Sequence, residues 1–211
     1  MSNKKVDPIY SSKRLLLSLN EAIKKLEALE HDKTEPIAII GMGCRFPGQV
    51  NHPETYWNFL YNGIDAITEV PLERWDYNTH YDSNPNAPGK TYTRHGAFLE
   101  DIDQFDPQFF GISPREAGAI DPQQRLLLEV TWEALEHSGQ APEKLRGSQT
   151  GVFLGFFLEE YSRFSVSSGD YLSIDPYNSL GTLRPLAAGR LAYVFDWQGP
   201  TFQVNTSCSS S

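Results

Sequence analysis

Short apolar segments alternate with helical patterns along most of this chain, and the alternation restricts the possible fold more than any other feature. Residues 37–40, 151–155 and 202–204 are apolar runs typical of buried strands. Between these strands, apolar residues recur with helical spacing over 53–63, 123–137 and 179–195. Strands separated by helices indicate an α/β layered fold.

Helix starts are marked by proline after a capping residue. Ser113-Pro114 with Glu116, and Asp121-Pro122, both place a cap, a proline and a favourable first turn in sequence. Pro185 is expected in the first turn of the helix over 179–195. Residues 71–96 are rich in Pro, Asn, Asp and Gly, so we expect long loops there with a short strand or two.

An aromatic patch is expected between residues 103 and 111. Phe105, Phe109 and Phe110 within it have the spacing of one helical face.

Composition excludes several functions. The net charge of −9 disfavours sequence-independent binding to nucleic acid or anionic lipid. No run approaches the roughly 20 apolar residues of a membrane span, and the N-terminus contains no signal-peptide core. The chain contains two cysteines, too few for a disulfide framework, so we expect a cytoplasmic protein.

Residues 12–31 form the clearest predicted helix. The spacing of its apolar stripe alternates between four and three residues, and the stripe comprises Leu15, Leu19, Ala22, Leu26 and Leu29, widened by Leu16 and Ile23. Two interpretations stay open: a helix that packs on its own domain, and a coiled coil that pairs two chains. A polar linker over 31–36 follows, so we divide the chain into 1–34 and 35–211.

Gly41-Met42-Gly43 follows the first predicted strand, as in a dinucleotide-binding motif. That motif requires a third glycine at position 46 and a helix that begins there, but Phe46 and Pro47 occupy these positions. A tight turn is therefore the better interpretation, with Cys44 as a small buried side chain.

The remaining polar residues give little support for other chemistry. The five histidines form no metal-ligand pair and there is no Cys-x-x-Cys, so no metal site is expected. His137 suits the C-terminus of a helix, and His95 has no clear role. Asp101, Asp103 and Asp106 lie in a loop-rich region, where turn and capping roles are commoner than catalysis.

Cys208 stands among small side chains shortly after the last predicted strand, in Asn205-Thr206-Ser207-Cys208-Ser209. A thiolate is a strong nucleophile, and a strand-to-helix turn can activate it by placing sulfur at a helix N-terminus. The setting resembles a nucleophile elbow without its usual glycines. On chemistry alone, both an inert thiol and a thioester-forming nucleophile remain open.

Several stretches together resemble the β-ketoacyl synthase domain of modular type I polyketide synthases. These stretches are 35–48 (EPIAIIGMGCRFPG), 109–117 (FFGISPREA), 121–129 (DPQQRLLLE), 188–193 (AGRLAY), 198–200 (QGP) and 205–211 (NTSCSSS). The resemblance covers residues 35–211 in unbroken order. It implies a thiolase-like fold of two related halves stacked as five layers, αβαβα, of which this chain resembles the first half.

The resemblance also implies a reaction. Cys208 matches the acyl-accepting cysteine at the N-terminus of a buried helix, and Cys208 is the one catalytic residue that we carry over. An acyl group would pass to it from the phosphopantetheine arm of an acyl carrier protein. In the complete domain, a decarboxylated malonyl-type extender then attacks the thioester. No directly bound cofactor and no metal are implied.

Departures from the family pattern are few. Asn205 and Ser207 stand where the family usually has Asp and Ala, which suggests a subfamily and not a lost nucleophile. The family's two catalytic histidines and a supporting lysine lie beyond residue 211, so we expect this piece alone to be inactive in condensation.

The segment before residue 35 resembles the helix that begins such multienzymes. In these proteins it pairs a homodimer or docks other polyketide synthase or peptide synthetase subunits, and we therefore expect Met1 to be a true start. The alternative function is a non-catalytic docking or dimerisation module.

Overall fold

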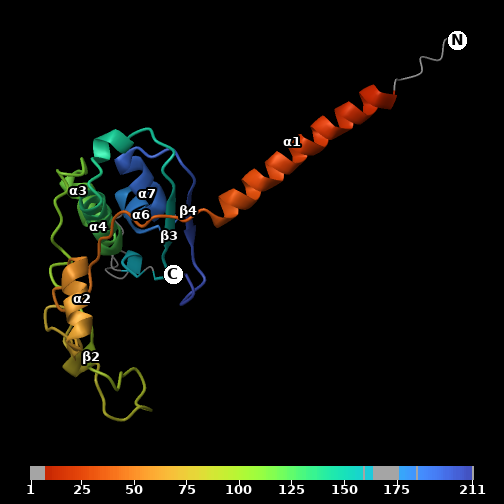
Figure 1. Cartoon of the computed structure of the whole chain (residues 1–211). Helices are drawn as coiled ribbons and strands as arrows, with labels where there is room; N and C mark the ends of the chain where they lie inside the picture. Colours follow the sequence, from red (N-terminus) through yellow and green to blue (C-terminus); the bar gives the residue numbers. More distant parts are fainter. Residues whose placement is uncertain (1–7, 159, 164–175, 184, 211) are drawn as a thin grey trace. The chain divides into compact units, whose positions relative to one another are not determined.

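The computed structural model describes residues 8–158, 160–163, 176–183 and 185–210, and the chain divides into two compact units, 1–39 and 40–211 (Figure 1). The first unit consists mainly of α1 (Pro8–Thr34), which confirms the predicted helix and extends it at both ends. The leucines of its stripe, from Leu15 to Leu29, are 56–68% exposed. In the described part of the chain, no helix has the length and apolar character needed to span a membrane.

The second unit is built around two parallel strands, β3 (Val152–Gly155) and β4 (Thr201–Val204). In their register, Val152 pairs with Thr201 and Gly155 with Val204. Between them in sequence come α6 (Pro176–Thr182) and α7 (Leu186–Phe195), and α7 packs on both strands (Figure 1). The predicted α/β layering is therefore confirmed here.

The core lies between α7, β3 and the helices of the middle of the chain. Ile120 and Leu128 are completely buried, and burying a side chain of this size contributes about 1.5–3 kcal/mol. The buried apolar cluster comprises Ile112, Ala117, Ile120, Leu128, Val152, Ala188, Leu191 and Phe195.

Both proline-marked helix starts are confirmed. In α3 (Pro114–Ala119), the Ser113 side chain accepts a hydrogen bond from the Glu116 amide at 3.2 Å. In α4 (Pro122–His137), Asp121 Oδ1 accepts one from the Gln123 amide at 2.9 Å. These side chains satisfy backbone donors that the first turn of a helix leaves without partners.

The aromatic patch exists, but residues 103–111 form turns and not a helix. Phe105 and Phe110 stack with ring centroids 5.4 Å apart, and Phe109 meets Trp132 of α4 edge to face at 4.7 Å. The turns begin at residues that bond the backbone locally, since Asp106 Oδ1 accepts from the Phe109 amide at 3.0 Å. The bond caps a single turn, which ends at Gly111, where a φ of 68° stops a helix from continuing.

The segment from 53 to 96 follows its prediction. It contains α2 (Pro53–Tyr61), the short helix η1 (Tyr77–Thr79), and the antiparallel pair β1 (Thr68–Glu69) and β2 (His95–Gly96), joined by loops. A further short helix, η2 (Pro142–Leu145), follows α4.

The predicted strand over 37–40 is wrong. These residues have no strand structure, and Ile37 and Ile39 are 94% and 84% exposed. A strand forms only when its backbone groups find a partner strand, and no described strand pairs with this segment.

The other two predicted strands are confirmed, but they are less buried than expected. Phe153 and Phe202 are 65% and 51% exposed and meet edge to face at 4.6 Å. Among the described residues, this face of the two-stranded sheet is therefore open.

The helix expected over 179–195 is confirmed over Leu186–Phe195, with Pro185 at its start, whereas residues 179–182 belong to a separate helix, α6. Pro185 precedes the first residue of α7, Leu186, as its N-terminal cap position and does not lie within a longer helix. Proline lacks the amide that a continuing helix would need.

A polar network joins α3, α4, α6 and α7. Arg190 of α7 donates to Glu116 at 2.9 Å and to Gln124 at 3.0 Å. Gln124, 2% exposed, donates to the carbonyl of Gly181 at 3.0 Å, and the amide of Asp121 donates to the same oxygen at 2.9 Å. The network holds α3, α4 and α6 against α7, the helix that packs on the two strands.

Candidate functional site

The carboxyl ends of β3 and β4 lie at one edge of the sheet because the strands are parallel. Val204 is the last residue of β4, and Cys208 follows four positions later in the sequence. The cysteine is exposed and not disulfide-bonded. The α/β topology thus presents a free thiol just past a strand end, as the sequence predicted.

Hydrogen bonds from small side chains hold the turn that carries Cys208. Asn205 Oδ1 accepts from the Ser207 amide at 3.2 Å, and the Thr206 amide donates to Ser210 Oγ at 2.9 Å. The Ser210 hydroxyl donates in turn to the Ser207 carbonyl at 2.8 Å. The serines and threonine of this segment are therefore structural partners of the backbone.

Ser207, directly before the cysteine, has a φ of 60°. A non-glycine residue in this left-handed region costs free energy and occurs where surrounding contacts enforce it. The Ser207 hydroxyl also lies 3.9 Å from Cys208 Sγ, within the range of a weak hydrogen bond to sulfur. The backbone at the candidate nucleophile is thus sharply turned, as in a nucleophile elbow.

Gly155 permits this turn to lie against β3. A Cβ atom at position 155 would stand only 2.6 Å from the carbonyl oxygen of Ser210. Any larger residue would displace either the strand or the turn. The sequence pattern predicts only that Gly155 belongs to a strand, so it does not reveal this positioning role.

Cys208 and Ser209 lie in a turn, so the described residues show no helix that begins at Cys208. Ser209 and Ser210 belong to the turn, where Ser209 Oγ donates to the Thr206 carbonyl at 2.9 Å.

Cys44, the other thiol, lies in a different environment. Burial raises the pKa of the Cys44 thiol, an effect that Arg45 opposes and Glu133 reinforces. A raised pKa lowers the fraction of the reactive thiolate. Its side chain is half-buried, whereas the sequence predicted a buried one.

Beside Cys44 is an ion pair that the sequence did not reveal. Arg45 donates to both carboxylate oxygens of Glu133, with Nη1–Oε2 at 2.6 Å. Burial raises the pKa of the neighbouring Glu129 carboxyl, with Arg45 opposing the shift and Glu133 adding to it. Glu129 and Arg45 also line a polar cavity of about 470 Å³, to which the Cys208 turn contributes no residue.

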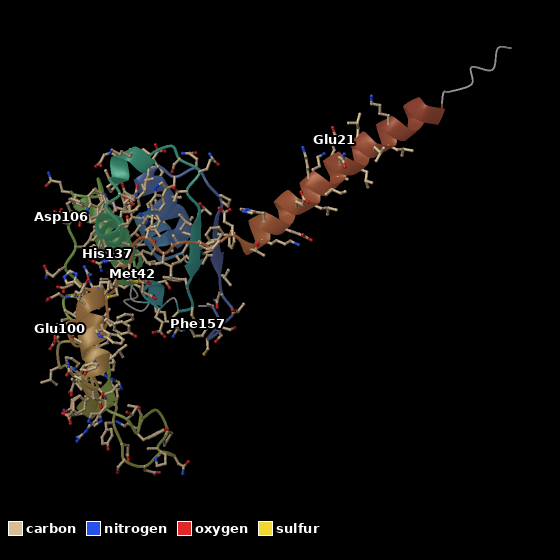
Figure 2. All side chains as sticks on the ribbon, in the orientation of Figure 1. Glu21, Met42, Glu100, Asp106, His137 and Phe157 are labelled. Carbon is tan, nitrogen blue, oxygen red and sulfur yellow. The ribbon has the colours of Figure 1, made fainter. Side chains whose placement is uncertain are left out.

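Gly41 and Gly43 are explained by close packing on α4. Cβ atoms at these positions would stand 2.2 Å from the Ala134 carbonyl oxygen and 2.6 Å from that of Val130. Between them, the Met42 amide donates to His137 Nδ1 at 3.2 Å, and Figure 2 shows these two residues together. No helix begins at residue 46, which agrees with rejection of the dinucleotide motif.

The remaining candidates have structural roles or none. His137 accepts the backbone hydrogen bond from Met42, and His95 lies 4.0 Å from Glu69 in the β1–β2 region. No hydrogen bond or ion pair of the described residues joins a histidine to Cys208. Within the same residues, no cluster of three or more His, Cys, Asp or Glu could hold a metal ion.

Comparisons with known proteins agree on one family. The sequence profile described as "Beta-ketoacyl synthase, N-terminal domain" matches residues 34–211. The chain is 48% identical over 200 residues to a phenolphthiocerol synthesis polyketide synthase type I of Mycobacterium marinum, covering 94% of this chain and 9% of that protein. It is 48% identical over 180 residues to a phenolphthiocerol/phthiocerol polyketide synthase subunit of Mycobacterium tuberculosis, covering 85% of this chain and 10% of that protein.

Solved structures agree as well. An oxazolomycin ketosynthase domain of Streptomyces albus matches with a TM-score of 0.73 and 37% identity, covering 82% of this chain and 29% of that one. A ketosynthase from module 6 of the bacillaene synthase of Bacillus subtilis matches with a TM-score of 0.69 and 34% identity. The match covers 82% of this chain and 27% of that one. The fold is that of the N-terminal part of these thiolase-like domains, and the chain spans about a tenth of the curated relatives' length.

Proposed function

The chain belongs to the β-ketoacyl synthase family, and on that premise we propose that Cys208 accepts an acyl group during polyketide chain extension. The observation that carries the proposal is the exposed thiol on a sharply turned backbone at the carboxyl end of β4. The two relatives and the two structures named above are polyketide synthases or ketosynthases, which supports the same role.

The proposed first step is thioester exchange. Cys208 thiolate attacks the carbonyl carbon of an acyl group carried on the phosphopantetheine thiol of an acyl carrier protein. A carbon–sulfur bond forms to Cys208, the bond to the carrier sulfur breaks, and the carrier leaves as a thiolate that takes up a proton. No directly bound cofactor is needed, because the carrier arm is part of the substrate.

The second proposed step is condensation in the complete domain. A malonyl-type thioester loses carbon dioxide, and the resulting carbanion attacks the Cys208 thioester. The new carbon–carbon bond replaces the bond to Cys208, whose sulfur is released. The chain spans 29% of the ketosynthase chain to which it was compared, and we propose that residues 1–211 alone do not complete this step.

Acyl transfer to Cys208 can be tested directly on the chain. We would incubate it with an acyl pantetheine thioester, digest it, and locate the added acyl mass by mass spectrometry. Wild type and Cys44→Ser should carry the acyl group on the peptide that contains Cys208, and Cys208→Ala should carry none. An acyl group at Cys44, or equal labelling of Cys208→Ala, would contradict the proposal. A β-ketoacyl product from residues 1–211 and malonyl carrier protein would refute the proposed inactivity in condensation.

We also propose a division of labour between the two parts of the chain. Residues 35–211 form the condensing part in a cytoplasmic enzyme, and the profile match that begins at residue 34 supports this boundary. Residues 1–34 mediate association, either of two copies or with another polyketide synthase or peptide synthetase subunit. The exposed leucine stripe of α1 supports a role of residues 1–34 in association.

Charged substitutions in the leucine stripe distinguish association through α1 from packing of α1 on its own domain. We expect Leu19→Glu combined with Leu26→Glu to abolish association while the urea midpoint of the condensing part stays unchanged. A lowered midpoint without a change in mass would instead show that α1 packs on its own domain. Sedimentation equilibrium and urea unfolding provide the two measurements.

A further inference from the structure

Both backbone groups of Ser207 are held by neighbours in the same turn. The Ser207 amide donates to Asn205 Oδ1 at 3.2 Å. Its carbonyl oxygen accepts from the Ser210 hydroxyl at 2.8 Å and from the Ser210 amide at 3.1 Å. These three bonds enforce the left-handed φ of 60° at Ser207. The position of the Ser207 Cβ atom relative to Cys208 is therefore set by the turn.

The Ser207 hydroxyl bonds to the sulfur of Cys208. Ser207 Oγ donates to Cys208 Sγ at 3.9 Å. The hydroxyls of the next two serines are directed to oxygen atoms instead. Ser209 Oγ donates to the carbonyl oxygen and to Oγ1 of Thr206, at 2.9 and 3.1 Å, and Ser210 Oγ donates to the Ser207 carbonyl. Among the hydroxyls described in this turn, that of Ser207 is the one bonded to sulfur.

The surroundings of the Cys208 sulfur contain little charge. β3, β4 and the turn over 205–210 contain no Asp, Glu, Lys, Arg or His. α7, which packs on both strands, carries Arg190 and Tyr193. Arg190 pairs with Glu116 at 2.9 Å, and Tyr193 is 87% exposed. Because no hydrogen bond of the described residues joins Cys208 to a charged group, a thiolate there depends on a neutral donor such as the neighbouring hydroxyl.

We propose that the Ser207 hydroxyl stabilises the thiolate of Cys208, the form that performs the acyl transfer proposed above. A hydrogen bond strengthens when its acceptor becomes an anion, so the hydroxyl favours the thiolate over both the thiol and the thioester. The hydroxyl keeps its own proton, and the thiol proton passes to solvent. The inference rests on the proposed function, and it gives a chemical role to one departure from the family pattern, since the usual alanine has no hydroxyl.

The effect of the hydroxyl on reaction rate has opposite signs at neutral and at high pH. A hydrogen bond of ordinary net strength corresponds to about a fivefold change in the ratio of thiolate to thiol. The same bond makes each thiolate about twofold less nucleophilic, because reactivity follows sulfur basicity with an exponent of about 0.4–0.5. Removal of the hydroxyl should therefore slow alkylation about twofold near neutral pH and raise its high-pH plateau about twofold. This combination is the crossed profile.

Iodoacetamide alkylation tests the hydrogen bond on a Cys44→Ser background, in which Cys208 is the only thiol. Ser207→Ala and Ser207→Gly should both give the crossed profile between about pH 6 and pH 10. Glycine relieves the strain of the left-handed φ and alanine retains it, so agreement of the two variants assigns the effect to the hydroxyl. Ser209→Ala is the matched control and should keep the wild-type profile, because the Ser209 hydroxyl bonds Thr206 and not the sulfur.

Three results would overturn the inference: a wild-type profile in Ser207→Gly, a crossed profile in Ser209→Ala, or a Ser207→Gly rate that falls at every pH. Acyl transfer from an acyl pantetheine thioester is measured separately, and Ser207→Gly should slow it about twofold near neutral pH. If Ser207→Gly gives the crossed profile but wild type takes up no acyl group, the proposed function fails although the hydrogen bond to the thiolate stands.

Discussion

Gly181 of α6 lies against the backbone that joins α3 to α4, and we predict that Gly181→Ala destabilises the chain. A Cβ atom there would stand 2.2 Å from the carbonyl oxygen of Ala119 and 2.9 Å from Ile120 Cα. Both neighbours are backbone atoms, so no side chain can rotate to make room. Gly189 of α7 is the matched control, because a Cβ there meets nothing within 4 Å.

The size of the effect follows from the contacts that would be disturbed. Overpacking against backbone costs about 1–3 kcal/mol. The Gly181 carbonyl accepts two hydrogen bonds, from the Asp121 amide and from Gln124, and each contributes about 1 kcal/mol. A better helix propensity of alanine offsets about 0.5–1 kcal/mol. We therefore expect a loss of about 2–4 kcal/mol, a large fraction of a typical stability of about 5–15 kcal/mol.

Gly189→Ala should change stability in the opposite direction, by about 0.5–1 kcal/mol, since only helix propensity changes. Urea unfolding followed by tryptophan fluorescence measures both, because Trp132 and Trp197 stack on Phe195 of the core. Wild type and both variants should have similar slopes and different midpoints. If Gly181→Ala unfolds at the wild-type midpoint or above it, the close approach of α6 to Ala119 is refuted.

Three further predictions concern the site and its surroundings. Gly155→Ala should change the rate of iodoacetamide alkylation of Cys208 severalfold, because the new Cβ would displace the Ser210 carbonyl; an unchanged rate would contradict the contact. Burial raises the pKa of Glu129, so its contribution to stability is present below its ordinary pKa and is lost as pH rises through the raised value. Glu129→Gln should therefore lose less stability than wild type between about pH 4 and pH 7, as measured by urea midpoints. Parallel pH profiles of the two proteins would refute the raised pKa of Glu129. Iodoacetamide at neutral pH should modify exposed Cys208 before Cys44, whose raised pKa lowers its thiolate fraction, and peptide mass spectrometry showing the reverse order would contradict this.

Elements with local determinants were predictable from the sequence. α4 begins where Asp121 and Pro122 predict it, because a cap and a proline act within one helical turn. The segment over 37–40 has equally clear apolar character, but a strand depends on a partner that local sequence does not specify. The start of α7 follows from Pro185, but the separate helix α6 was not predictable, since its sequence PYNSLGT contains few apolar residues with helical spacing.

The candidate site shows the same division between local and distant determinants. The residue type and small neighbours of Cys208 left both an inert and a reactive thiol open, and the resemblance over residues 35–211 made it the candidate nucleophile. Gly155 contributes through the absence of a side chain, and its contact with Ser210 depends on the register that sets Gly155 opposite Val204. The positioning role of a glycine in a predicted strand cannot be recognised until the parallel pairing is known. Such a position is therefore detected only when the fold brings it against the reactive turn, and its substitution tests the site without touching the nucleophile.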